Sequence, residues 1–156
     1  MIALVDNYDS YTFNLAHLIA QVSGREPLVV PAGEAEGLPD RVRKGEFSHV
    51  VISPGSGTPE NDSDFAGSRR VVEAATNIPL LGVCLGHQGL AALAGSRVTR
   101  APEPRHGFVS QITRSGEGIF TGLPQGFNAV LCSPQARWRC RCCRGSPGCG
   151  RRCRCS

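Results

Sequence analysis

The residues with the clearest potential for chemistry lie in the segment Gly82-Val83-Cys84-Leu85-Gly86-His87-Gln88-Gly89. A short apolar run leads directly into Cys84 and a helical pattern follows it, which is the layout of a nucleophile elbow with cysteine in place of serine. Gly82 and Gly86 leave room for the tight turn, and the N-terminus of the helix would lower the pKa of the thiol. The pattern predicts a nucleophilic cysteine, with the backbone N–H of Leu85 placed to stabilise an oxyanion. A buried structural cysteine is the alternative reading.

A second loop, Ser-Pro-Gly-Ser-Gly-Thr-Pro at residues 53–59, follows another short apolar run. Its two glycines between prolines predict a rigid loop whose N–H groups can face a bound carbonyl oxygen. Alone, such a loop is usually only a turn. It gains weight because the cysteine segment follows at the next predicted strand.

A third loop, Asp-Asn-Tyr-Asp-Ser-Tyr-Thr at residues 6–12, follows the first apolar run of the chain. Asp9 or Ser10 could simply cap the helix that comes next. Two aromatic and two acidic residues on one short loop also suit an interface with a partner protein.

The elements that position these loops alternate between short apolar runs and helical patterns, as in β-α-β units around a mostly parallel sheet. Strands are predicted at 2–5, 28–30, 49–52 and 79–83, and helices at 12–22, 64–75 and 87–94. Shorter strands, expected to be antiparallel, follow at 96–99, 107–113 and 127–130. Because active sites in doubly wound sheets lie beyond the carboxyl ends of the strands, the three loops should meet at one edge.

Three motifs, VDNYDSYTFN, SPGSGTP and GVCLGHQ, resemble in order and spacing the class I glutamine amidotransferases. Within that family they are similar to the glutaminase parts of aminodeoxychorismate synthase and anthranilate synthase, over about residues 1–130. The resemblance implies a three-layer, doubly wound, flavodoxin-like α/β fold with a mostly parallel sheet, incomplete at the C-terminus here. It also implies hydrolysis of glutamine through a thioester and delivery of ammonia to a chorismate-binding synthase, with no cofactor and no metal.

The same resemblance assigns roles to individual residues. Cys84 is the expected nucleophile, and the N–H groups of Gly57 and Leu85 are the expected oxyanion hole. His87 is expected to be structural or interfacial, because the family's base lies elsewhere. The glutamine-binding residues are expected to be Gly55, Ser56, Gly57 and Gln88, and the synthase interface is expected to hold Asp6, Asn7, Tyr8, Asp9 and Ser10.

The segment Ala-Pro-Glu-Pro-Arg-His-Gly at 101–107 bears on which synthase is served. Many anthranilate-type members have methionine before the His-Gly pair. The Pro-Arg-His-Gly form, with Leu-Pro-Gln at 123–125, is more similar to aminodeoxychorismate synthases. The sequence therefore favours a role in aminodeoxychorismate and folate synthesis. Anthranilate synthase component II in tryptophan synthesis, and an inactive docking module, are the alternatives.

The family pattern ends near residue 130. Leu-Cys-Ser-Pro at 131–134 stands where the family has a glutamine-binding strand, and no histidine follows His106. The His and Glu of the family's base pair are therefore missing from this chain. Because general acid–base catalysis contributes about 10²–10⁴ in rate, this chain alone is predicted to hydrolyse glutamine negligibly.

Residues 131–156 differ in composition from residues 1–130, since they hold seven arginines and no acidic residue, so the net charge of +4 describes neither part. Three readings of this tail remain open: a gene read out of frame after about residue 130, a zinc site, and an arginine cluster for nucleic acid. The first is favoured, because the cysteines are not paired as in a zinc ribbon and an arginine stands beside nearly every one. No strand is predicted in the tail. The zinc reading would use Cys140, Cys142, Cys143, Cys149, Cys153 and Cys155.

Length and hydropathy set the remaining expectations. A chain of 156 residues suits one domain with a real core. It has no apolar run of about 18 residues, and its start carries acids where a signal peptide needs basic residues. A cytoplasmic protein that binds neither membrane nor nucleic acid is expected.

Overall fold

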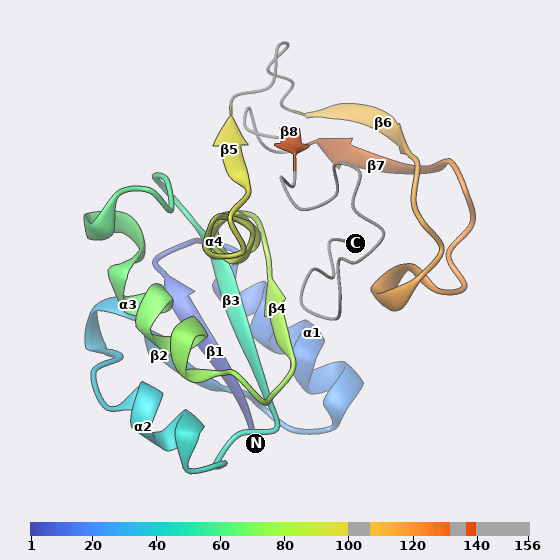
Figure 1. The fold of residues 1–156 in the computed structure, drawn as a ribbon. Helices are drawn as coiled ribbons and strands as arrows, with labels where there is room; N and C mark the ends of the chain where they lie inside the picture. The colour runs from blue at the N-terminus through green and yellow to red at the C-terminus, as the bar shows by residue number, and fades with distance from the viewer. Residues whose placement is uncertain (100–106, 132–136, 140–156) are drawn as a thin grey trace. The chain divides into compact units, whose positions relative to one another are not determined.

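The computed structural model describes residues 1–99, 107–131 and 137–139 (Figure 1). The chain divides into two compact units, residues 1–93 and 94–156. The expected change of character after residue 130 stays a prediction. The cysteines proposed for zinc, together with the Pro-Arg-His-Gly segment up to His106, lie outside the described residues.

The first unit is built on a sheet of four parallel strands in the order β2-β1-β3-β4. Ala3 of β1 pairs with Leu28 of β2 and with Val50 of β3, and Val50 pairs in turn with Leu80 of β4. This confirms the predicted parallel α/β architecture. The strands are β1 (Ile2–Asn7), β2 (Leu28–Pro31), β3 (His49–Gly55) and β4 (Leu80–Gly82).

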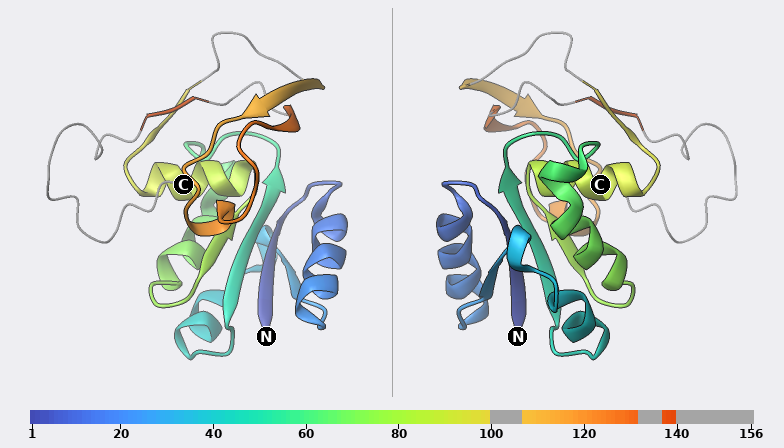
Figure 2. Two further views of the ribbon diagram at one scale, coloured as in Figure 1. Left: turned by 90° about the vertical axis from the view of Figure 1, so that its right-hand side faces the viewer. Right: turned by 90° about the vertical axis from the view of Figure 1, so that its left-hand side faces the viewer.

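Helices cover both faces of this sheet, which makes three layers (Figure 2). Along β1, Val5 points to a core cluster that contains Phe65, whereas Leu4 packs with Ala16 on the opposite face. Burying a side chain of the size of Phe65 stabilises the fold by roughly 1.5–3 kcal/mol. One face carries α1 (Thr12–Ser23), and the other carries α2 (Leu38–Arg43), α3 (Asp62–Ala74) and α4 (Leu85–Leu93).

Two features of the helices differ from the sequence prediction. The apolar residues Phe13, Leu15, Leu18, Ile19 and Val22 have spacings that predict one helical face, but Phe13 is 65% exposed and Val22 is 90% exposed. Only one side of α1, including Leu15 and Ile19, packs against the sheet. The segment after β2 also forms a 3-10 helix, η1 (Ala32–Glu34), and α2, neither of which was predicted. These pieces are too short to carry a helical hydrophobic period, and tertiary burial of Leu38 and Val42 stabilises α2 instead.

The second unit contains two separate antiparallel strand pairs among its described residues. β6 (Phe108–Ile112) pairs with β7 (Phe127–Leu131), and the 3-10 helix η2 (Gly118–Phe120) lies between them in the chain. The predicted antiparallel direction of these strands is confirmed. β5 (Arg97–Thr99) pairs with β8 (Arg137–Arg139), so the expectation that the tail forms no strand is wrong. Three residues suffice because ladder hydrogen bonds come from the backbone and need no apolar alternation.

Candidate active site

Cys84 lies at the junction of β4 and α4 in a left-handed backbone conformation, with φ of 52°. A non-glycine residue is rarely held there, and such strain concentrates at functional sites. The thiol is exposed, so the alternative reading of a buried structural cysteine is wrong. The turn is closed by hydrogen bonds from the Gly86 N–H to the Val83 oxygen at 3.0 Å and from the Gln88 N–H to the Cys84 oxygen at 2.9 Å.

The glycines on either side of Cys84 are needed for close packing. A Cβ on Gly82 would lie 2.5 Å from the backbone nitrogen of His87, where strand and helix cross. A Cβ on Gly86 would collide with the carbonyl group of Ile52 in β3. Because neither backbone can retreat cheaply, the first turn of α4 is pressed onto the sheet. This packing holds the helix N-terminus, with its partial positive charge, at the cysteine.

The loop at residues 53–59 meets both other loops at Gly55. A Cβ on Gly55 would lie 2.6 Å from Cβ of Asn7 and 2.7 Å from a methyl group of Leu85. The ends of β1, β3 and β4 are therefore in contact, as the topology rule predicted. Ser56 is exposed beyond this point, and Leu85, whose N–H is the expected oxyanion donor, has a side chain that is 1% exposed. The side chain of Gln88 is only 4% exposed, in the second turn of α4.

Gly57, the other expected oxyanion donor, has a φ of 88°, a conformation that favours glycine. The carboxylate of Asp64 occupies the space that a side chain on Gly57 would need. One carboxylate oxygen, Oδ2, accepts a hydrogen bond from the Thr58 N–H at 3.1 Å. The loop is thereby tied to the first turn of α3. The sequence did not single out Asp64 for this contact, because its position at a helix N-terminus already explained it.

Asn7 has a different place from the one expected. It was assigned to the partner interface, but it is 5% exposed and its side chain is bonded inside the molecule. Its amide nitrogen donates to the Ser53 oxygen at 3.0 Å, and its Oδ1 accepts from the Ser68 hydroxyl at 2.6 Å. Its backbone N–H donates to the Ser53 hydroxyl at 2.9 Å. Asn7 therefore links the ends of β1 and β3 to α3. Ser68, which completes the network, carried no signal in the sequence.

The remaining residues of the 6–12 loop divide into a scaffold and a surface. Asp6 accepts hydrogen bonds from the Tyr8 N–H at 2.8 Å and from the Thr12 hydroxyl at 2.6 Å, which closes the loop from within. Asp9 accepts from the Tyr11 N–H at 2.8 Å, ahead of the first turn of α1. Ser10 is exposed. The acids of this loop are thus largely explained by turn formation.

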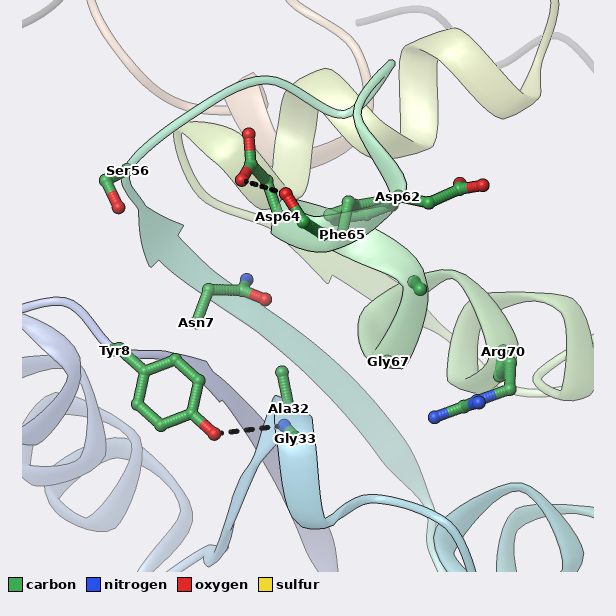
Figure 3. Close-up of a pocket in the computed structure, with 12 residues that line it drawn as sticks. Asn7, Tyr8, Ala32, Gly33, Ser56, Asp62, Asp64, Phe65, Gly67 and Arg70 are labelled. Carbon is green, nitrogen blue, oxygen red and sulfur yellow. Dashed lines mark hydrogen bonds between the residues drawn. The ribbon is translucent and has the colours of Figure 1, made fainter.

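Tyr8 is the most distinctive surface residue of that loop. It has a φ of 61° and is 69% exposed. Its hydroxyl accepts a hydrogen bond from the Gly33 N–H at 3.2 Å, as Figure 3 shows. Beside it lies a pocket of about 310 Å³ that also reaches Ser56, Asp64 and Arg70. The pocket borders the 53–59 loop without including Cys84 among its lining residues.

His87 lies on α4, and part of its side chain reaches solvent. The surrounding protein removes some of the water from its imidazole, and this desolvation lowers the pKa of the ring. The ring is therefore neutral at neutral pH, which makes it able to accept a proton but not to hold a permanent charge. Among the described residues, no group of three or more His, Cys, Asp or Glu side chains is arranged to hold a metal ion. No helix in the described part of the chain is long and apolar enough to cross a membrane.

Taken together, the parallel sheet and its covering helices define an α/β protein with a strained, exposed cysteine at a strand-to-helix turn. The family model for class I glutamine amidotransferases matches residues 3–131. The chain belongs to this family.

Individual relatives agree with this assignment. An aminodeoxychorismate synthase of Streptomyces griseus is 48% identical over 127 residues, which cover 81% of this chain and 17% of that protein. An anthranilate synthase component 2 of Mycobacterium tuberculosis is 41% identical over 131 residues, which cover 83% and 55% respectively. This chain thus spans only part of the length of these relatives. A crystal structure of a glutamine amidotransferase from Thermotoga maritima superposes with a TM-score of 0.67 at 18% identity, covering 88% of this chain and 61% of that one, which supports the fold.

Proposed function

We propose that this chain supplies the nucleophile and the oxyanion hole of a glutaminase that serves a chorismate-using synthase. The observation that carries the proposal is the strained conformation of Cys84, exposed at the N-terminus of α4. A structural cysteine gains nothing from a left-handed backbone, whereas a nucleophile gains a sulfur that projects from the sheet edge.

In the proposed reaction, the Cys84 thiolate attacks the side-chain carboxamide carbon of glutamine. The carbonyl oxygen becomes an oxyanion, which accepts hydrogen bonds from the N–H groups of Leu85 and Gly57. The C–N bond then breaks, the nitrogen leaves as ammonia after taking up a proton, and a glutamyl thioester remains on Cys84. Water hydrolyses this thioester to glutamate and restores the thiol. Gly55, Ser56 and Gln88 are proposed to hold the substrate, with backbone groups of the loop as its main contacts.

The residues given a role above include no group for the protonation steps. The histidines of the sequence are His17, His49, His87 and His106, and none follows residue 106. His17 and His49 lie on α1 and at the start of β3, and His87 lies in the first turn of α4. Because thiol activation is helped by a general base and protonation of the leaving nitrogen needs a general acid, we propose that a polypeptide of this sequence turns over glutamine negligibly on its own.

The preferred synthase is the aminodeoxychorismate type. The higher identity to the Streptomyces griseus protein than to the Mycobacterium tuberculosis protein supports this choice, in line with the Pro-Arg-His-Gly segment at 104–107. Anthranilate synthase component II is the alternative. The chorismate-binding partner would contact the exposed side of the 6–12 loop, where Tyr8 and Ser10 lie.

A second candidate function is a docking module that binds a synthase without catalysis. The exposed Tyr8 of the 6–12 loop supports it, because a surface that docks a partner needs no catalytic group. Ammonia release from glutamine by the full chain, measured with and without an added chorismate-aminating synthase, separates the candidates. Release only in the presence of the partner supports the enzyme part, and binding of the partner without release supports the docking module. Rapid release by the chain alone would contradict the proposal that the base is missing.

A further inference from the structure

Asp64 lies in the first turn of α3 and is half-buried against the 53–59 loop. Its two carboxylate oxygens have separate partners. Oδ1 accepts a hydrogen bond from the Ser63 hydroxyl at 2.9 Å, which is drawn in Figure 3. Oδ2 accepts from the Thr58 N–H at 3.1 Å. A carboxylate that only complements the helix dipole would need no contact with the preceding loop.

The hydrogen bond between Thr58 and Asp64 lies next to Gly57, whose N–H is an expected oxyanion donor. Gly57 can adopt many backbone conformations because it has no Cβ, so the direction of its N–H is not fixed by local sterics. The Thr58 N–H belongs to the next peptide plane, and the bond to Asp64 holds that plane. The carboxylate also fills the space over Gly57, which excludes any larger residue there.

We infer that Asp64 is a positioning residue, which orients the Gly57–Thr58 segment so that the Gly57 N–H points to the oxyanion site. The inference rests on the proposed function, because it assigns Asp64 a role toward the same oxyanion. A direct catalytic role is excluded by charge, since a carboxylate beside a developing oxyanion would oppose it. The hydrogen bond from Thr58 and the positive end of α3 offset the charge of Asp64 in the resting state.

The opposite end of the loop is held independently. The Asn7 side chain and the Ser53 backbone join it to β1, four residues before Gly57. Thr58 also belongs to the turn that starts α3, since the Asn61 N–H donates to its oxygen at 3.2 Å. The segment that carries Gly57 therefore lies between two anchored ends, and Asp64 supplies the anchor on the helix side.

The test uses labelling of Cys84 in the full chain, because turnover is expected to be negligible. A chloroketone analogue of glutamine alkylates the thiolate with loss of chloride, through a tetrahedral alkoxide that uses the oxyanion hole. Iodoacetamide alkylates the same thiolate without such an intermediate. Mass spectrometry of the peptide that spans residues 71–97 follows Cys84 separately from the other cysteines, and protection by glutamine shows that the chloroketone occupies the substrate site.

The expected result is a change in the ratio of the two rates. Asp64→Ala should lower chloroketone labelling by about 10-fold or more, because a misplaced oxyanion donor is a large loss, while iodoacetamide labelling stays within about 2-fold. Asp64→Asn should restore most of the rate, since it keeps an acceptor for the Thr58 N–H. Asp62→Ala is the matched control: it removes an equal charge from the same helix turn, and the Asp62 carboxylate pairs with Arg69 at 3.5 Å.

The outcomes separate this inference from the proposed function. If wild-type Cys84 shows no labelling that glutamine protects against, the proposed function fails. If wild type is labelled and Asp64→Ala keeps the same ratio of rates, the positioning role is overturned. An equal loss with both reagents in Asp64→Ala, or no rescue by Asp64→Asn, also overturns it, because the effect would then come from the fold or from charge.

Discussion

The two compact units of this chain differ in where they place their apolar residues. Residues 1–93 bury two core clusters, one with Leu4 on one face of the sheet and one with Ile52 and Phe65 on the other. Among the described residues of 94–156, Phe108, Val109 and Ile119 are more than half exposed. The expected catalytic residues are all in the first unit. Site geometry of this kind needs a backbone held by a packed core, and within the described parts of the chain the buried apolar side chains lie in the first unit.

The difference in packing between the two units should be largest when one glycine in each unit is replaced by alanine. Gly86→Ala drives a Cβ into the carbonyl of Ile52, so we expect a loss of roughly 4 kcal/mol or more in unfolding free energy. Gly126→Ala, with φ of 70° and nothing within 4 Å, should cost about 1–2 kcal/mol from backbone strain alone. Hydrogen exchange of the amides in β1 and β3, measured across a urea titration, gives the unfolding free energy of the first unit. Equal losses of unfolding free energy in Gly86→Ala and Gly126→Ala would contradict the proposed difference in packing between the two units.

Truncating one phenylalanine in each unit should give the next largest difference. Phe65→Ala leaves a cavity in the core and should cost about 3–5 kcal/mol. Phe108→Ala, at a residue that is 58% exposed, should change the unfolding free energy by less than about 0.5 kcal/mol. The same urea titration measures both variants. A large loss in Phe108→Ala would mean that the second unit has a core of its own that the described residues do not contain.

A smaller difference is expected for serines. Ser68→Ala removes the hydroxyl that bonds to Asn7 and leaves a buried amide oxygen short of a partner, at a cost of about 1–3 kcal/mol. Ser115→Ala, an exposed turn residue of the second unit, should lie within about 0.5 kcal/mol of wild type. Hydrogen exchange at the ends of β1 and β3 should rise only in Ser68→Ala. An unchanged exchange rate there would show that the network does not hold the site.

The smallest effect concerns pH. Because burial lowers the pKa of His87 in the folded chain, the unfolded chain binds the proton first as pH falls. His87 therefore destabilises the fold progressively below its ordinary pKa of about 6.5, and has no such effect above it. The fall in unfolding free energy between pH 7.5 and 5.5 should be smaller in His87→Gln than in wild type. Identical dependence of unfolding free energy on pH in His87→Gln and wild type would show that His87 makes no such contribution.

Sequence reasoning predicted that the three strand-end loops lie together, because the signals for those loops are local. The glycines beside Cys84 and the apolar runs of β1, β3 and β4 fix strand ends, and topology then brings the loops together. The partnerships of Asn7 and Asp64 were not visible in the sequence. Asn7 bonds to Ser53 and Ser68, which are 46 and 61 residues away, and Asp64 bonds back to the backbone of Thr58, a contact that depends on how the loop folds onto α3. The strand β8 was missed because its pairing depends on the backbone of β5 and not on apolar alternation.

We propose that Cys84 is a competent nucleophile and that a polypeptide of this sequence, on its own, protonates the leaving nitrogen poorly. An aryl thioester of the γ-carboxyl of glutamate separates these two parts. Its thiolate leaving group departs without being protonated, so acylation of Cys84 needs no general acid, whereas glutamine itself must release protonated nitrogen.

The decisive measurement compares these two substrates on the full chain, with peptide mapping of the acylated cysteine and Cys84→Ser as control. We predict rapid acylation of Cys84 by the aryl thioester, slow hydrolysis of the resulting glutamyl thioester, and negligible release of ammonia from glutamine. Acylation that does not favour Cys84 over the other cysteines, or ammonia release from glutamine at a rate comparable with acylation by the thioester, would contradict it.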